Sequence, residues 1–254
     1  MQRLADKTIL ITGGGGGLGS AAVALFIKQG ARVVISDLNV DAGKALAARY
    51  GKQAAFVEHD VTNEAAWTRA MAFVAQQFGR LDVLINNAGI LQSGTIETAT
   101  LAQWRQLMQV NADSCFLGCQ QGILAMKAHG GSIVNVASVA SWMPMQDFPA
   151  YGASKAAVAS LTRTAALHCR KKGYAIRVNS LHPDGIYTPM MQASAPGITP
   201  EQILFDPARN PKGRARMPDD IARLWVFLAS DEAQAVSGCA LQADNAILGM
   251  GLWP

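Results

Sequence analysis

The chain has 254 residues, of which half are apolar and 16% carry a charged side chain. This length and composition are typical of one globular α/β domain and exclude a disordered chain. The formal charge is +4, but the densest basic cluster is only residues 170–172, without the basic stripe and interleaved aromatic residues of a nucleic-acid-binding surface. No uninterrupted apolar run approaches the ~20 residues that cross a bilayer. We therefore expect neither a nucleic-acid partner nor a membrane partner.

Short apolar, β-branched runs alternate with amphipathic stretches along the whole chain. Strands are predicted at 8–12, 32–36, 54–58, 83–85, 133–137, 175–181 and 239–242. Helices are predicted at 18–28, 41–50, 64–78, 101–127, 151–172 and 218–229. This alternation predicts an α/β fold in a single domain, 1–254, with a doubly wound parallel sheet and helices on both faces. The stretch 184–217 is rich in proline and glycine, and we interpret it as a substrate loop or lid.

A glycine-rich turn joins the first predicted strand to the first predicted helix. Residues 12–19 read TGGGGGLG, and such a turn lets the backbone approach a pyrophosphate closely. The helix that follows offers free N–H groups and a positive dipole end to the phosphates. A flexible loop would have the same composition, but the strand–turn–helix context favours a Rossmann-type dinucleotide site. Gly13, Gly17, Leu18 and Gly19 are the candidate cofactor-binding residues here.

The second predicted strand leads to Asp37, roughly 20 residues after the glycine turn, where Rossmann-type sites place a carboxylate. A carboxylate at this point accepts hydrogen bonds from the adenosine ribose hydroxyls and repels a 2′-phosphate. Leu38 follows, and no arginine lies nearby in the sequence to bind that phosphate. We therefore predict NAD rather than NADP as the cofactor. The alternative interpretation is a solvated aspartate in a turn.

Tyr151 and Lys155 lie one helical turn apart and therefore on one helix face. A cation ~4 Å from a phenol lowers its pKa from near 10 by about two to three units, which makes the phenol an acid/base group. Such pairs are also common on helix surfaces. Ser138 follows the fifth predicted strand, where its hydroxyl can donate to a substrate oxygen. Asn111 is either a solvent-facing residue of the helix 101–127 or a residue that frees a carbonyl to hold a water beside Lys155.

Together these motifs resemble those of the short-chain dehydrogenases/reductases over the whole chain. The matching segments are residues 12–19, Asp60 with Val61, residues 86–89 (NNAG), Asn111, Ser138, Tyr151 with Lys155, and Pro183 followed by Ile186 and Thr188. The resemblance implies a catalytic tetrad of Asn111, Ser138, Tyr151 and Lys155. It further implies that Asp60 and Val61 contact adenine, that Asn87, Ala88 and Gly89 pack beside the cofactor, and that Ile186 and Thr188, after Pro183, hold the carboxamide. Tyr151 and Lys155 would themselves contact the cofactor.

One position departs from the family pattern. The family has Pro-Gly after the sixth strand, whereas this chain has Pro183-Asp184-Gly185. Aspartate tolerates unusual backbone angles better than most residues, so we expect the turn to form.

Three further segments, which are less widely shared, are similar to those of bacterial hydroxysteroid dehydrogenases of the 3β/17β type, a branch of this family. These segments are residues 118–122, 177–191 and 246–252. They imply an NAD(H)-dependent oxidoreductase that transfers a hydride between nicotinamide and a bulky, apolar secondary alcohol or ketone, with a 3β/17β-hydroxysteroid as substrate. One alternative is a broad dehydrogenase of bulky aromatic or alicyclic alcohols without a steroid role. A remote alternative is a dinucleotide-binding sensor that has lost catalysis.

An apolar substrate requires apolar walls with few polar anchors. The predicted lining is Leu91, Ser138, Ser141, Trp142, Met143, Tyr187, Met190 and Met191, with the loop residues Ile203, Leu204 and Phe205. The alternative is that these side chains pack the loop onto the body or form a subunit contact. His182 is interpreted as a packed or hydrogen-bonded histidine, because the phenol already serves as the acid/base group.

The cysteines and the termini bear on location and assembly. The four cysteines form no CxxC pair, and neither they nor the histidines have metal-ligand spacing, so we assign no metal. Residues 1–7 are polar and lack a signal-peptide pattern, which predicts a reduced, cytoplasmic protein. The family resemblance implies a homotetramer built through the two long helices and the tail, and the apolar residues of 115–125 and 157–167 agree with that.

Overall fold

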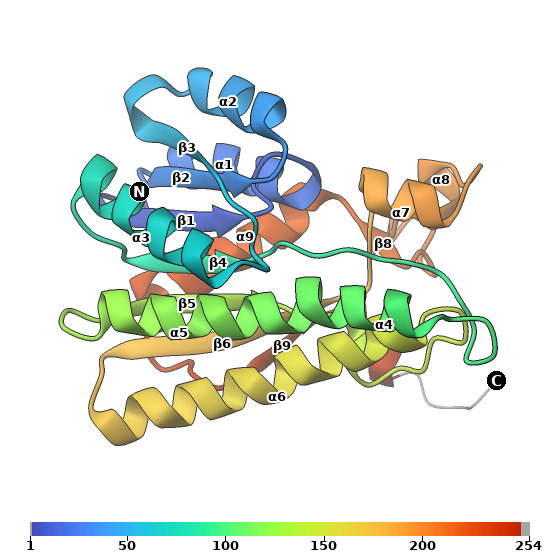
Figure 1. The fold of residues 1–254 in the computed structure, drawn as a ribbon. Helices are drawn as coiled ribbons and strands as arrows, with labels where there is room; N and C mark the ends of the chain where they lie inside the picture. Colours follow the sequence, from blue (N-terminus) through green and yellow to red (C-terminus); the bar gives the residue numbers. More distant parts are fainter. Residues whose placement is uncertain (1, 250–254) are drawn as a thin grey trace.

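In the computed structural model, which describes residues 2–249, the chain forms a parallel seven-stranded sheet between two layers of helices (Figure 1). The strand order is β3-β2-β1-β4-β5-β6-β9. The strands are β1 Thr8–Thr12, β2 Arg32–Asp37, β3 Ala54–Glu58, β4 Val83–Asn86, β5 Gly131–Val136, β6 Ile176–Pro183 and β9 Ala240–Ala243. The predicted doubly wound α/β fold is confirmed, and the predicted strands all form to within two residues at each end.

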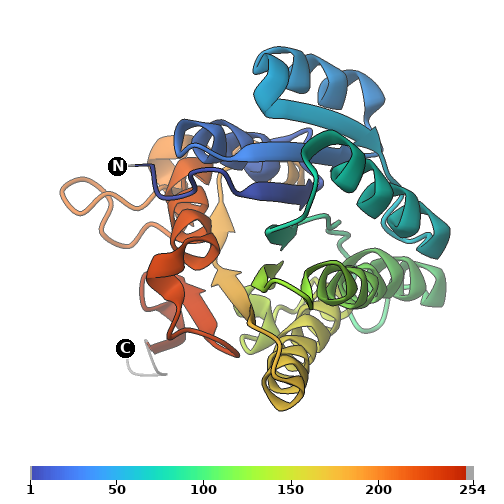
Figure 2. The same cartoon turned by 90° about the vertical axis from the view of Figure 1, so that its left-hand side faces the viewer.

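The main helices of the two layers are α1 Gly17–Lys28, α2 Val40–Ala48, α3 Glu64–Phe78, α4 Leu101–Met108, α5 Ser114–Met126, α6 Pro149–Lys172 and α9 Pro218–Ala229. Helices α1 and α9 pack together on one face, and α3, α5 and α6 cover the other (Figure 2). Successive strand residues serve the two faces in turn: Ile9 and Ile11 belong to the core under α1, whereas Leu10 packs under α3. Because both faces are buried, the strands are apolar throughout.

The chain order reverses between β1 and β4, which are neighbours in the sheet. The segments that follow these two strands diverge at this point, and the crevice between them is where open α/β sheets bind ligands. Two hydrogen bonds join the segments, because Asn87 Nδ2 donates to the carbonyls of Thr12 (2.8 Å) and Gly13 (3.0 Å). The glycine turn therefore lies at this crevice.

The helical stretch predicted at 101–127 is confirmed, but its middle is not α-helical. A π-helical turn, Gln109–Asp113, separates α4 from α5. The side chain of Asn111, in this turn, accepts from the Ile90 N–H (2.8 Å) and donates to the Ile90 carbonyl (3.0 Å). Single π-helical turns inside α-helices occur mostly at functional sites, and this one positions a predicted catalytic residue. Helix α6 also starts two residues before the predicted Tyr151, because Pro149 suits the first helical turn.

The predicted loop 184–217 contains the short helices α7 Pro189–Ser194 and α8 Pro200–Ile203 and a small two-stranded sheet of β7 Gly185–Ile186 and β8 Ala215–Arg216. Both helices lie beside the carboxyl end of the main sheet (Figure 1). Asp184, the departure from the family pattern, does not need an unusual backbone conformation, since its φ is not positive. Its carboxylate pairs with Nε (2.8 Å) and Nη2 (2.9 Å) of Arg214, which fastens the start of the loop to its end.

No helix among residues 2–249 is long and apolar enough to cross a membrane. The tail segment 246–252, which resembles that of hydroxysteroid dehydrogenases, is described only up to residue 249. Residues 250–252, like Trp253 and Pro254, lie outside the described residues.

Gly118→Ala tests the tight contact between α5 and the sheet. An added Cβ would overlap the side-chain oxygen of Asn86 and lie 2.8 Å from the indole of Trp67. Asn86 is held in place by its 2.8 Å hydrogen bond to Asn135, so we expect the free energy of unfolding to fall by about 2 kcal/mol. At Gly122 on the same helix the nearest atoms are flexible methyl ends, so Gly122→Ala should cost less than half as much. Urea unfolding measures both, and equal losses would contradict the explanation.

Candidate active site

The four predicted catalytic residues come together at the carboxyl end of the sheet. Ser138 follows β5 by two residues, Tyr151 and Lys155 lie in the first turns of α6, and Asn111 lies in the π-helical turn. Gly89, after β4, faces this group closely. A Cβ on Gly89 would lie 3.2 Å from Asn111 Oδ1 and 3.5 Å from Lys155 Nζ, so only glycine leaves this space open.

Lys155 is almost completely buried, with 4% of its surface exposed. Its Nζ donates to the carbonyl of Val136, the last residue of β5, at 2.8 Å. Burial lowers the pKa of Lys155 to about 8, because removal from water disfavours the charged form, and the nearby Cys115 raises it to a smaller extent. Nζ lies 5.7 Å from the centre of the Tyr151 ring.

The expectation that Lys155 lowers the pKa of Tyr151 is wrong for the protein without a bound cofactor. Burial raises the pKa of Tyr151 above 10, and only the neighbouring Ser138 hydroxyl acts against this. The physical reason is that Lys155 is itself desolvated and donates to Val136, so it is a weaker and less directed cation than the sequence argument assumed. The phenol of Tyr151 is consequently protonated at neutral pH.

The sequence argument missed two serines that support the tetrad. Asn111 Nδ2 also donates to Ser154 Oγ (3.1 Å), and Ser154 in turn donates to the Tyr151 carbonyl (2.8 Å). Ser141, predicted only as a pocket wall, donates to the Lys155 carbonyl (2.9 Å). Ser154 lies between Tyr151 and Lys155 on the same helix, so its closeness to Asn111 could have been suspected from the spacing.

The glycine turn has the geometry of a phosphate cradle. Gly13 and Gly17 have φ of +62° and +51°, which side-chain-bearing residues rarely adopt, and a Cβ on Gly19 would overlap the Gly13 carbonyl. Helix α1 begins without a side-chain cap and without an acidic residue in its first turn, so its first N–H groups face an incoming anion. By contrast, Asn39 and Asn63 cap α2 and α3. The residues present therefore fit a dinucleotide pyrophosphate.

Asp37 lies beside this cradle, at the end of β2. Its Oδ2 accepts from the Gly15 N–H and its Oδ1 from the Asn39 N–H, both at 2.9 Å. The carboxylate is thus held by backbone donors, and among the residues that the structure describes no lysine or arginine pairs with it. Leu38 is 64% exposed next to it.

Most of the remaining predicted cofactor residues lie just after strands of the main sheet, at the same edge. Asp60 and Val61 follow β3, Asn87, Ala88 and Gly89 follow β4, and Pro183 ends β6. The Asp60 carboxylate accepts from Thr62, and the Val61 carbonyl accepts from the Trp67 indole. Ile186 lies in β7, and Thr188 caps α7 close to the cradle, with its side chain 3.8 Å from where a Gly17 Cβ would be.

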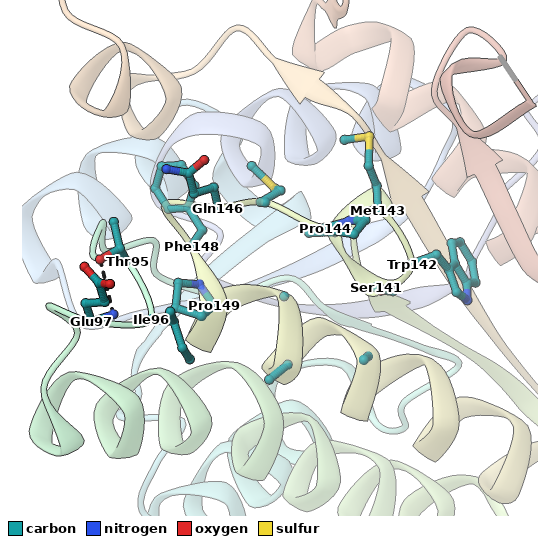
Figure 3. Close-up of a pocket in the computed structure, with 15 residues that line it drawn as sticks. Thr95, Ile96, Glu97, Ser141, Trp142, Met143, Pro144, Gln146, Phe148 and Pro149 are labelled. Carbon is teal, nitrogen blue, oxygen red and sulfur yellow. Dashed lines mark hydrogen bonds between the residues drawn. The ribbon is translucent and has the colours of Figure 1, made fainter. Parts of the chain in front are cut away.

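A largely apolar hollow of about 700 Å³ lies between the segment after β4 and the segment after β5 (Figure 3). Of the predicted substrate residues it contains Ser141, Trp142 and Met143. Its other walls are Thr95, Ile96, Glu97, Ala140, Pro144, Met145, Gln146, Phe148, Pro149, Gly152, Ala153 and Ala156. Trp142 points away from Ile96 and Pro149, and its ring stacks on His182 with a centroid distance of 4.1 Å.

The other predicted substrate residues do not line this hollow. Leu91 follows Gly89, Tyr187 precedes α7, and Met190 and Met191 lie in α7, with Met190 44% exposed. In the loop, Ile203 is the last residue of α8 and Leu204 follows it. The centre of the Phe205 ring lies 4.1 Å from the guanidinium carbon of Arg216. Within residues 2–249, no three His, Cys, Asp or Glu side chains are grouped as metal ligands.

Comparison with known proteins gives matches over nearly the whole chain. A family model described as enoyl-(acyl carrier protein) reductase matches residues 14–246. A 3-beta-hydroxysteroid dehydrogenase of Comamonas testosteroni is 57% identical over 252 residues, 99% of this chain and 99% of that protein. An NADP-dependent (R)-specific alcohol dehydrogenase of Lentilactobacillus kefiri is 37% identical, covering 96% and 97%. A trans-4-hydroxycyclohexanecarboxylate dehydrogenase of Sinomonas cyclohexanicum is 38% identical, covering 96% and 93%.

Two buried histidines make the folded state sensitive to acid. Burial lowers the pKa of both His59 and His182 from 6.5 to about 4. Their contribution to stability is therefore full above pH 6.5 and is lost as the pH falls from 6.5 toward 4, by roughly 3 kcal/mol for each histidine. We expect urea unfolding to show this loss, and His59→Phe, which cannot titrate, to have a flatter pH profile. A profile for His59→Phe as steep as that of the wild type would contradict the assignment.

Proposed function

Since the chain belongs to the short-chain dehydrogenase/reductase family, we propose that it is an NAD(H)-dependent dehydrogenase of a bulky, apolar secondary alcohol, with a 3β- or 17β-hydroxysteroid as the substrate. The observation that carries this proposal is the convergence of Ser138, Tyr151 and Lys155 beside the glycine cradle. The 57% identity to a 3-beta-hydroxysteroid dehydrogenase over the whole chain supports the substrate class.

The proposed roles follow from the contacts of each residue. In reduction, the protonated Tyr151 donates its proton to the carbonyl oxygen of the ketone, while the Ser138 hydroxyl holds that oxygen. Lys155 joins α6 to the end of β5 through its bond to Val136, and Asn111 holds the loop at Ile90 against α6. Oxidation of the alcohol uses the same groups in reverse. A nicotinamide bound in the cradle would supply or accept the hydride and, in its oxidised form, would add a positive charge that favours the phenolate of Tyr151.

The proposed preference for NAD rests on Asp37. Its carboxylate is fixed by two backbone donors, so it cannot turn away from an added phosphate without losing both bonds. Two like charges ~4 Å apart repel by about 4 kcal/mol at an effective dielectric of 20, before screening by salt. The exposed Leu38 offers no compensating cation.

A bulky substrate is supported by the apolar surface near the tetrad. Trp142 and Met143 follow Ser138 by four and five residues, and Arg214 of the loop 184–217 contacts the sulfur of Met143 at 3.9 Å. The relatives include dehydrogenases named for a steroid and for a cyclohexane carboxylate, which share an alicyclic ring as the bulky part. A broad dehydrogenase of alicyclic alcohols is therefore the second candidate.

We also propose a homotetramer in the cytoplasm. The support for assembly is that Phe116 and Leu124 on α5 and Leu167 on α6 are about half exposed, although they are large and apolar. The support for a reducing compartment is that all four cysteines are free.

Tyr151→Phe tests the proposed chemistry. Because it removes the proton donor and leaves the ring in place, we expect turnover of a 3β- or 17β-hydroxysteroid to fall by ~10³-fold. NADH binding, measured by energy transfer from tryptophan, should stay unchanged, and Tyr174→Phe, at the far end of α6, serves as the matched control. Full activity of Tyr151→Phe at the NADH absorbance band would refute the assignment. Turnover of alicyclic alcohols but not of steroids would favour the second candidate.

The cofactor preference is tested by comparing kcat/KM for NADH and NADPH. We expect a preference for NADH of ~100-fold, set by the repulsion between Asp37 and a 2′-phosphate. The double variant Asp37→Ser with Leu38→Arg should reverse or abolish this preference, since it removes the anion and adds a cation. A wild-type enzyme that uses NADPH more efficiently would show that the Asp37 interpretation is wrong.

A further inference from the structure

His182 is a buried histidine, the last residue but one of β6, and none of the roles proposed above uses it. Its side chain is completely buried, with 0% of its surface exposed. Nδ1 lies 3.0 Å from the carbonyl oxygen of Ser138, Nε2 lies 2.8 Å from Ser180 Oγ, and the ring stacks on Trp142 with an interplanar angle of 23°. All polar atoms of the ring are therefore partnered.

The contacts determine the tautomer of His182. A backbone carbonyl only accepts hydrogen bonds, so Nδ1 carries the proton and donates to Ser138. Nε2 is then unprotonated and accepts from the hydroxyl of Ser180. Burial lowers the pKa of His182 to about 4, so the ring is neutral at physiological pH and keeps this arrangement.

The histidine adds a side-chain hydrogen bond just beyond the point where the backbone ladder between β5 and β6 ends. Strands β5 and β6 are in register up to Val136 and Leu181, and the Ala137 N–H still donates to the Leu181 carbonyl at 2.9 Å. The next backbone donor along β6 would be Pro183, opposite the Ala137 carbonyl, but proline has no N–H, so the backbone ladder ends here. One residue further along, the imidazole of His182 donates to the carbonyl of Ser138 and continues the link between the two segments.

We propose that His182 is a positioning residue for the reaction, which fixes the backbone of Ser138 so that its hydroxyl faces the substrate oxygen. This inference rests on the proposed role of Ser138. Beyond the end of the ladder, three contacts hold Ser138: its Oγ accepts from the Ala140 N–H at 3.2 Å, and its carbonyl accepts from the Ser141 N–H and from His182 Nδ1, each at 3.0 Å. The first two come from the same short segment as Ser138, whereas the contact with His182 ties that segment to β6. Without the contact from His182, the segment that carries Ser138 can shift relative to β6, and a displacement of about 1 Å in such a group costs up to ~100-fold in rate.

Two substitutions separate positioning from packing. His182→Phe keeps a ring against Trp142 but removes the donor to Ser138, and we expect kcat to fall by ~10–100-fold at saturating cofactor, with little change in the KM of the dinucleotide. In His182→Asn the side-chain amide reaches about as far as Nδ1, so kcat should recover to within about threefold of the wild type. His59→Phe is the matched control, because His59 is also buried, bonded to a serine and packed on a tryptophan. It should lose stability without losing kcat.

A double-mutant cycle with Ser138→Ala completes the test, with folding checked by thermal unfolding. If His182 acts through the Ser138 hydroxyl, His182→Phe adds little further loss of kcat when that hydroxyl is absent. Additive losses, a kcat of His182→Phe within twofold of the wild type, or failure of His182→Asn to recover kcat would each overturn the inference. Should Ser138→Ala itself keep full turnover, the proposed role of Ser138 would fail instead, so the two failures are distinguishable.

Discussion

One buried ammonium group holds the site together. Lys155 loses nearly all contact with water, which costs several kcal/mol for an ion without a partner. The carbonyl of Val136, 2.8 Å from Nζ, offsets part of this cost and fastens α6 to the end of β5. Because Ser138 lies two residues beyond Val136, and Tyr151 lies one turn before Lys155, this single bond brings both hydroxyl groups to the same place. The lowered pKa of Lys155, about 8, is the electrostatic consequence of the same burial.

Around this cation, the polar groups are joined by hydrogen bonds between segments that are far apart in the sequence. Asn111 binds the backbone of Ile90 on one side and Ser154 of α6 on the other, and it does so from a π-helical turn that interrupts the helix. Such a distortion is stable only where tertiary contacts compensate for the lost helical regularity. The site is thus held from three sides, by the strand β5, the segment after β4 and the helix α6, which limits how far its hydroxyl groups can drift.

The sequence was sufficient to predict the parts of the fold that depend on local pattern. The apolar strands, the glycine turn and the polar residues that follow strand ends, such as Asp37 and Ser138, all appear where the periodicity and the turn residues indicated. The π-helical turn, the stack of Trp142 on His182 and the ion pair of Asp184 with Arg214 were not predictable in this way. Each depends on a contact between distant segments, for which a single sequence carries no local signal.

The direction of the Tyr151 pKa shows the same limit in energetic terms. Helical spacing correctly placed an ammonium near the phenol, but the sign of the shift is decided by desolvation, which depends on the whole surrounding fold. Without a bound cofactor, Tyr151 keeps its proton at neutral pH, so the phenol can donate a proton to a ketone. Formation of the phenolate costs about 1.4 kcal/mol for each unit by which its pKa exceeds the ambient pH. The fold therefore sets where the proton moves, and the charge of whatever binds beside Tyr151 sets how readily it moves in each direction.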